Sequence, residues 1–326
     1  MSALSSADFW AFVGVVAGIY AMFGLGVQLQ YGHGGLMNFG QSAFMAIGAY
    51  AMVILTVDVG LSMWVASVIA VFLAAAVGVL LGLPCVRLRG DYLAITTLAF
   101  AEIVRQVATN EGRLTGGAQG TIAIGSDNEG AAFNHAWLRF QENVGDALGG
   151  LIGVELSNDA TMLILVWAVV IVLVLVMQGA TRSPWGRLVH AVRDDDVAAT
   201  SLGKQASQVK VQVFALGAAL GAIAGVFYAY QFAFFVPDDF AAVTTLFAWT
   251  TVIIGGLGRN WGVPVGALIF GVLFAGTRFL TFPPLSYLDS ADRAYLRLMI
   301  IGLLIIALVA FRPQGLFGKR ESLGFD

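Results

Sequence analysis

The chain has 326 residues, of which 59% are hydrophobic and only 11% are charged. Soluble domains carry charge on about 25% of their residues, so this composition excludes an ordinary soluble globular protein. The formal net charge of −3 indicates little by itself, because the placement of charges matters more than their sum in such a chain.

Long apolar blocks indicate the type of spanning element. Residues 162–177, 211–236, 240–258 and 298–311 contain no charged side chain. Blocks of this length match a hydrocarbon core of about 30 Å at about 1.5 Å per helical residue. Backbone groups in lipid must be satisfied internally, which leaves helices or a closed barrel. Barrel strands would alternate polar and apolar residues, and these blocks do not. The sequence therefore predicts an all-α polytopic membrane protein.

About nine transmembrane or re-entrant helices are predicted, within one membrane domain that covers residues 1–326. In chain order they are 9–29, 36–57, 62–83, 91–109, 161–177, 211–235, 240–257, 263–280 and 295–311. The second begins in the glycine-rich stretch 32–35, so it is either a full span or a broken, re-entrant helix. We expect the first to be a retained span, because residues 1–8 lack the basic start of a secretory signal. Gly217, Gly221 and Gly225 form a small-residue seam that predicts close helix packing.

The basic residues predict the orientation. Lys and Arg gather in the loops around residues 87–89, 182–210 and 259 and in the tail at 312–320. These four regions fall on the same side of the predicted spans, which the positive-inside rule makes cytoplasmic. The acid-rich segment 110–159 falls on the opposite, extracytoplasmic side. We expect the N-terminus outside and the C-terminus inside.

An internal similarity suggests a repeat. Residues 91–98 (DYLAITTL) resemble residues 239–246 (DFAAVTTL), and both open a predicted span from opposite faces. Inverted repeats are common in transporters and place the substrate path at the repeat interface. The sequence thus suggests two inverted halves, with a chance match in apolar sequence as the alternative.

Motifs for chemistry are missing from the sequence. It contains no G-x-x-x-x-G-K-[ST] phosphate loop, no H-E-x-x-H motif and no G-x-S-x-G elbow. The single Cys85 excludes an internal disulfide and does not make a metal site. We expect a conduit, not an enzyme, with its energy supplied by another protein.

The cytoplasmic segment 183–203 is predicted to be a short amphipathic helix. Pro184 suits a helix start, and Gly203 suits a helix stop. An apolar stripe (Leu188, Val192, Ala199 and Leu202) and a polar stripe (Arg187, His190 and Asp194) run along it. Such a helix lies on lipid, docks on a soluble partner, or is a solvated loop helix. Its run of three aspartates argues against anionic lipid.

Several short motifs follow one another along nearly the whole chain, from Gly32 to Gly318. They are GLMNFGQSAFMAIGAY at 35–50, LRGDYLAITTLAF at 88–100, TGGAQG at 115–120, GR…AVRD…AA…LG within 186–203, GGLG at 255–258 and RPQGLFG at 312–318. In this order they resemble the LivM-type permeases of branched-chain amino acid ABC importers.

The resemblance implies a set of partners. They are a second related permease, two ABC ATPases that bind ATP and Mg²⁺, an extracytoplasmic solute-binding protein and membrane lipid, with no nucleic acid and no cofactor or metal on this chain. It also implies a multi-pass protein of the bacterial cytoplasmic (inner) membrane. In this family's coupling loop, the ATPase-coupling residues would be Gly186, Arg187, Ala191, Arg193, Asp194 and Gly203.

Polar residues within the apolar spans are candidates for the substrate path. Asn38 and Gln41 share one helix face, and Thr96 and Thr97 lie in the fourth span. They either line the path or bond neighbouring helices and backbone. The family usually has Ser-Leu-Gly-His where this chain has residues 38–41 (NFGQ), which bears on specificity for branched-chain substrates.

Three functions remain open at this point. The first is an ABC permease for neutral or hydrophobic amino acids, or for urea and short amides. The second is a self-contained channel or secondary transporter for a small solute, which would not need the helix at 183–203. The third, a membrane-embedded enzyme, has no visible reactive constellation. Glu102 and Arg105, late in the fourth span, are either functional or a self-neutralising pair.

Overall fold

The computed structural model describes residues 7–276 except 86, 89, 124–128, 153–156 and 233, together with scattered residues between 292 and 317. Every regular element in the described part is a helix, which confirms the predicted all-α fold. The predicted ninth span, 295–311, and the basic tail fall largely outside the described residues.

Seven of the predicted spans have counterparts that begin and end near the expected residues. They are α1 (Ala7–Val27, continued by a π-helical segment, Gln28–His33), α3 (Met63–Cys85), α4 (Asp91–Asn110), α6 (Asn158–Arg182), α9 (Ala206–Gln231), α10 (Ala242–Gly255) and α11 (Gly262–Gly276). Four stretches are long and apolar enough to cross a membrane: Ala7–His33, Met63–Cys85, Asn158–Arg182 and Ala206–Gln231. The expectation of a polytopic membrane protein is therefore confirmed.

The second predicted span is broken. Its helix, α2 (Gln41–Val57), begins five residues later than predicted, because residues 34–40 are not helical. Gly35 has a φ of 68°, a left-handed conformation that glycine adopts without the steric cost of a side chain. Of the two alternatives for this span, the structure shows the broken helix.

The core is built on α1, α2 and α9. Side chains along α1 are buried on all sides, since it packs against α6, α9, α10 and α11, while α2 packs against α3 and α9. The glycine seam of α9 faces α2, and a Cβ at Gly225 would overlap the Met45 carbonyl oxygen. Because small residues let membrane helices approach closely, the predicted packing role of this seam is confirmed.

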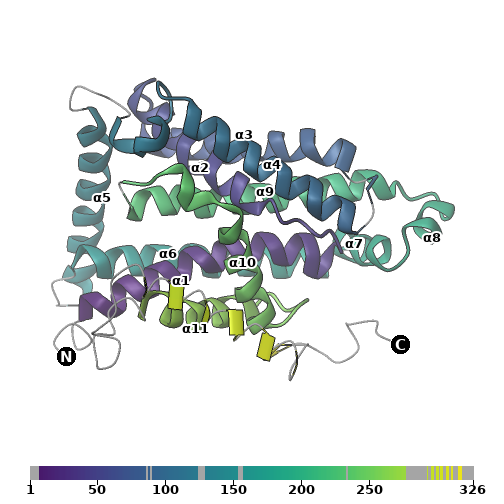
Figure 1. The fold of residues 1–326 in the computed structure, drawn as a ribbon. Coiled ribbons are helices and arrows are strands. Elements are labelled where there is room, and N and C mark those ends of the chain that lie inside the picture. Colours follow the sequence, from purple (N-terminus) through teal and green to yellow (C-terminus); the bar gives the residue numbers. More distant parts are fainter. Residues whose placement is uncertain are drawn as a thin grey trace.

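One end of the bundle is covered by a helix that the sequence did not predict. Helix α5 (Glu129–Ile152) lies across the ends of the other helices (Figure 1), within the acid-rich segment 110–159. Its Trp137 ring stacks on Tyr230 of α9 with centroids 4.1 Å apart, and Trp64 of α3 packs beside it. Trp and Tyr are enriched at membrane–water interfaces, which suits a helix that lies across the ends of spanning helices.

The opposite end carries two short helices, α7 (Pro184–Asp194) and α8 (Asp196–Ser201), where the sequence predicted one continuous helix (Figure 1). The break is at Asp195, which is extended with φ −153°. Its carboxylate accepts hydrogen bonds from the backbone N–H groups of Val197 and Ala198, and so caps α8. A side chain that competes for backbone donors ends one helix and starts the next.

Candidate functional site

A buried polar cluster lies at the break between the π-helical segment and α2. Asn38 Nδ2 donates to Gln30 Oε1 at 2.9 Å and to Gln41 Oε1 at 3.0 Å, and all three side chains are at most 1% exposed. Isolated buried amides are costly, so three of them bonded together form a self-satisfied unit within the apolar core. We call Gln30, Asn38 and Gln41 the amide cluster.

The amide cluster is joined to the backbone of α9. Gln30 Nε2 donates to the Phe214 carbonyl at 3.0 Å, and Gln41 Nε2 donates to the Gly217 carbonyl at 2.7 Å. The close approach needs glycine, because a Cβ at Gly217 would overlap the Gln30 side chain. Through these two hydrogen bonds, the amide cluster joins the π-helical segment and the start of α2 to the backbone of α9.

The start of α2 is held from two sides by threonines. Thr97 Oγ1 of α4 accepts from the Phe39 N–H at 3.1 Å, and Thr245 Oγ1 of α10 accepts from the Ser42 N–H at 2.9 Å. Ser42 is in the first turn of α2, where N–H groups have no partner within the helix, and Phe39 lies in the non-helical segment just before it. The two hydroxyls therefore replace partners that water supplies elsewhere. Among the described residues, the buried Ser42 Oγ has no hydrogen-bond partner.

Aromatic side chains cover the cluster on the α10 side. The Trp249 ring stacks on Phe39 with centroids 5.0 Å apart and an interplanar angle of 11°, and Tyr31 lies 4.7 Å from it. Trp249 Nε1 also donates to the Asn38 carbonyl at 3.2 Å. The surroundings of the amide cluster are thus neutral, aromatic and able to donate or accept hydrogen bonds.

The structure brings together three of the four residues predicted for the path. Asn38, Gln41 and Thr97 are buried and meet at the start of α2, whereas Thr96 is half-buried on the neighbouring face of α4. In this conformation they serve the alternative role, bonding neighbouring elements; whether they also line the path stays a prediction.

The sequence analysis missed Gln30, Thr245 and Trp249. Gln30 was visible as an amide at the end of an apolar span. Thr245 was visible as the counterpart of Thr97 in the internal similarity between residues 91–98 and 239–246.

The π-helical segment that contains Gln30 also contacts α7. Arg193 Nη1 donates to the Gly32 carbonyl at 2.6 Å, and Gly32 belongs to the same π-helical segment as Gln30. The His33 Nε2 atom lies 2.7 Å from Asn260 Oδ1, and its ring is 5.2 Å from that of His190. Burial, and secondly the nearby Arg193 guanidinium, lower the pKa of His190. The π-helical segment therefore contacts α7 through Gly32 and contributes Gln30 to the amide cluster, and π-helical turns often mark functional positions.

The predicted coupling residues divide between two faces of α7 and α8. Arg187, Ala191, Asp194 and Gly203 are exposed, and so are Val197 and Leu202, at 63% and 81%. Gly186 is buried against the Thr181 carbonyl, and Arg193 turns into its own chain. Val192 and Ala199 of the predicted apolar stripe are buried in this chain, so they do not face a partner.

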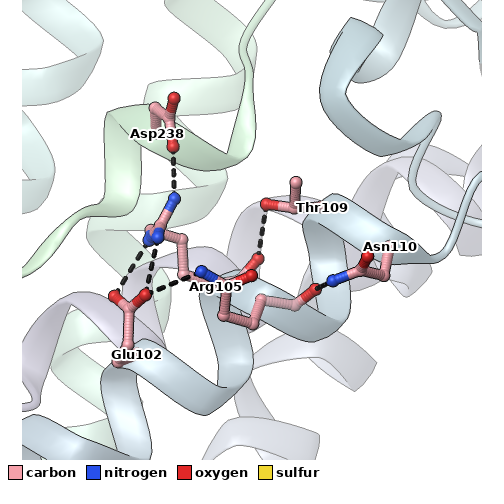
Figure 2. Close-up of polar contacts among 6 residues, drawn as sticks. Glu102, Arg105, Thr109, Asn110 and Asp238 are labelled. Atoms are coloured by element: carbon pink, nitrogen blue, oxygen red, sulfur yellow. Dashed lines mark hydrogen bonds and ion pairs between the residues drawn. The ribbon is translucent and has the colours of Figure 1, made fainter.

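An ion-pair cluster lies in the second half of α4, closer to its C-terminal end than Thr97 (Figure 2). Arg105 donates to Glu102 at 2.6 Å and 2.9 Å and also contacts Asp238, in the 3-10 turn Pro237–Phe240. The predicted Glu102–Arg105 pair is therefore present, and it extends to a third residue that the sequence analysis did not include. Within the described residues, no three His, Cys, Asp or Glu side chains gather as a metal site.

Comparison with known proteins decides the family. Residues 10–309 match the sequence profile of the branched-chain amino acid transport system / permease component family. The chain belongs to this family. The permease is 34% identical over 311 residues to the high-affinity branched-chain amino acid transport system permease protein LivM of Escherichia coli K12, covering 93% of this chain and 69% of that protein. The Salmonella typhimurium LivM protein is 33% identical over 308 residues, with the same coverage.

A second type of permease also matches. The LivH permease protein of Salmonella typhimurium is 29% identical over 166 residues, which are 51% of this chain and 50% of LivH. No solved structure matches the chain significantly. Matches to two differently named permeases show that both LivM and LivH proteins are related to this chain. The helices, the apolar spans and the family together make the chain a multi-pass membrane transport component.

Proposed function

We propose that this chain is one of the two permease subunits of an ATP-driven ABC importer for neutral or hydrophobic amino acids. In this proposal two ABC ATPase subunits bind and hydrolyse ATP with Mg²⁺, and an extracytoplasmic solute-binding protein delivers the amino acid. The assembly lies in the bacterial cytoplasmic membrane. The LivM and LivH relatives are branched-chain amino acid permease proteins, which supports these amino acids as substrates.

The hydrogen-bonded connection from α7 to the amide cluster carries the proposal. Arg193 on α7 bonds the Gly32 carbonyl, and two residues earlier Gln30 bonds Asn38. A displacement of α7 would therefore move the segment that holds the amide cluster and the start of α2. A self-contained channel has no need for such a connection.

The chemistry of the interior supports a neutral substrate. None of the buried side chains among the described residues is an Asp, Glu, Lys or Arg. An amino acid in its zwitterionic form carries no net charge, and its apolar side chain suits surroundings such as Phe39 and Trp249. Short amides have the same neutral, hydrogen-bonding chemistry, so urea and short amides are the alternative substrates.

Uptake in cells tests this proposal. The chain, its second permease, the ATPases and the binding protein are produced in a bacterial strain that lacks leucine uptake, and labelled leucine is supplied. We expect leucine uptake that unlabelled valine and isoleucine compete away and that a tenfold larger excess of urea leaves unchanged. A matched ATPase with its phosphate-loop lysine replaced should abolish uptake. Competition by urea or acetamide alone would assign the amide alternative, and uptake without ATP hydrolysis would assign a channel.

A further inference from the structure

We infer that the outward face of α4 is the surface that packs against the second permease within the membrane. This α4 face consists of Tyr92, Ile95, Ala99, Glu102 and Gln106, all exposed in the isolated chain. The inference rests on the proposed function, because it takes a second permease as the partner.

The α4 face points away from the chain's own core. The buried residues of α4 form one stripe, which consists of Leu93, Thr97, Ala101 and Ala108. Successive helical residues are rotated by about 100°, which places Gln106 opposite this stripe and Glu102 beside Gln106. Two large apolar side chains on the same face, Tyr92 and Ile95, are 72% and 65% exposed.

The polar groups of this face lie within the predicted fourth span, 91–109. Glu102 precedes the last residue of α4, Asn110, by about two turns, which is roughly 12 Å at 1.5 Å per residue. The Glu102 side chain is 48% exposed, and its Oε1 accepts from Gln106 Nε2 at 2.9 Å. Ionisable side chains at this depth face protein or water instead of lipid. Accordingly, α4 is long enough to span, yet it is not among the four stretches apolar enough to cross on their own.

The net charge of the ion-pair cluster indicates which groups the partner surface should carry. Glu102, Arg105 and Asp238 together carry a net charge of −1 at neutral pH (Figure 2), and Arg105 is already bonded to both carboxylates. The partner surface should therefore present hydrogen-bond donors near Glu102 and Gln106, and apolar side chains near Tyr92 and Ile95.

The position of the α4 face within the membrane decides which partner fits this surface. A soluble binding protein or ATPase does not reach a face that runs along α4 inside the membrane. A helix of the second permease does. The inward side of α4 holds the start of α2 through Thr97, so only the width of α4 separates the proposed interface from the start of α2.

Spin labels test the α4 face in the assembled transporter. A single cysteine is placed at Ala99 or at Gln106 in a Cys85→Ala background, with Val172 on α6, 56% exposed and apolar, as the matched control. Collisions of the label with oxygen report contact with lipid, and collisions with a water-soluble nickel chelate report contact with water. On assembly with the second permease, both α4 labels should lose oxygen collisions without gaining nickel collisions, while the Val172 label keeps its oxygen collisions.

Two results overturn the inference. Oxygen collisions at Ala99 and Gln106 equal to those at Val172 would show a lipid-facing surface, and strong nickel collisions would show a water-filled path. The use of two labels guards against one of them disturbing the fold. Leucine uptake is measured on the same labelled complexes, so a failed interface with intact uptake leaves the proposed function standing. Absence of leucine uptake by the unlabelled wild-type complex would count against the proposed function instead.

Discussion

Thr97 and Thr245 hold the same helix start from opposite sides: Thr97 Oγ1 accepts the Phe39 N–H, and Thr245 Oγ1 accepts the Ser42 N–H. They occupy the same position in the two similar stretches, 91–98 and 239–246. Helix α4 enters the bundle from the end that carries α7, and α10 enters from the opposite end. The match in position is thus accompanied by a match in bonding, and the inverted repeat itself stays a prediction.

Replacing Thr97 tests the support of the α2 start. Thr97→Val removes the acceptor and leaves the Phe39 N–H buried without a partner, which costs about 1–3 kcal/mol. Thr97→Ser keeps the hydroxyl and should be close to the wild type. The measurement is thermal unfolding of the purified complex in detergent. Thr96→Val, one residue away and half-buried, is the control, and an equal loss of stability in both valine variants would contradict the assigned role.

The amide cluster predicts a large effect at Asn38. Asn38→Leu leaves Gln30 Oε1, Gln41 Oε1 and the Gly40 N–H without their partner, at about 1–3 kcal/mol for each unsatisfied group. We expect lower thermal stability and loss of leucine uptake. The control is Asn110→Leu at the exposed end of α4. Wild-type uptake and stability in the Asn38 variant would show that the cluster is dispensable.

Substitutions on the two faces of α7 should cause two different defects, one in coupling and one in assembly. Arg193→Glu breaks the bond to Gly32 inside the chain, so the ATPases should still assemble and hydrolyse ATP while uptake is lost. Ala191→Trp alters the exposed face of α7, so the binding of the ATPases to the permease should itself weaken. Loss of a central contact in an interface commonly costs about 2 kcal/mol or more of binding free energy. Co-purification, ATPase activity and uptake separate the two. Glu142→Ala on α5, at the other end, serves as control, and normal uptake in both α7 variants would exclude a coupling role.

The two ends of the bundle predict a topology. A cysteine at Glu142 on α5 should react with an impermeant maleimide added outside intact cells, whereas a cysteine at Val197 on α8 should react only after the cells are opened. The basic residues near α7 and α8 supply the reason. Reaction of both cysteines from the same side would contradict the predicted orientation.

The spans were predictable from the sequence, because the apolar blocks and their basic flanks reflect the lipid directly. Other features depend on contacts between distant residues. The break at Asp195 needs a side chain that competes for backbone N–H groups, and Gln30 acquires a role only when Asn38 approaches it. Helix α5 mixes charged and aromatic residues, so its sequence lacks a spanning signal, and its position depends on contacts such as Trp137 with Tyr230.

The central claim is that ATP hydrolysis on partner subunits moves this permease through α7. The most direct measurement is labelled leucine uptake by proteoliposomes that contain both permeases and the ATPases, with ATP inside and the binding protein outside. The account predicts uptake that requires ATP and that Arg193→Glu abolishes while ATP hydrolysis continues. Equal uptake with and without ATP, or full uptake by the Arg193→Glu complex, would contradict it.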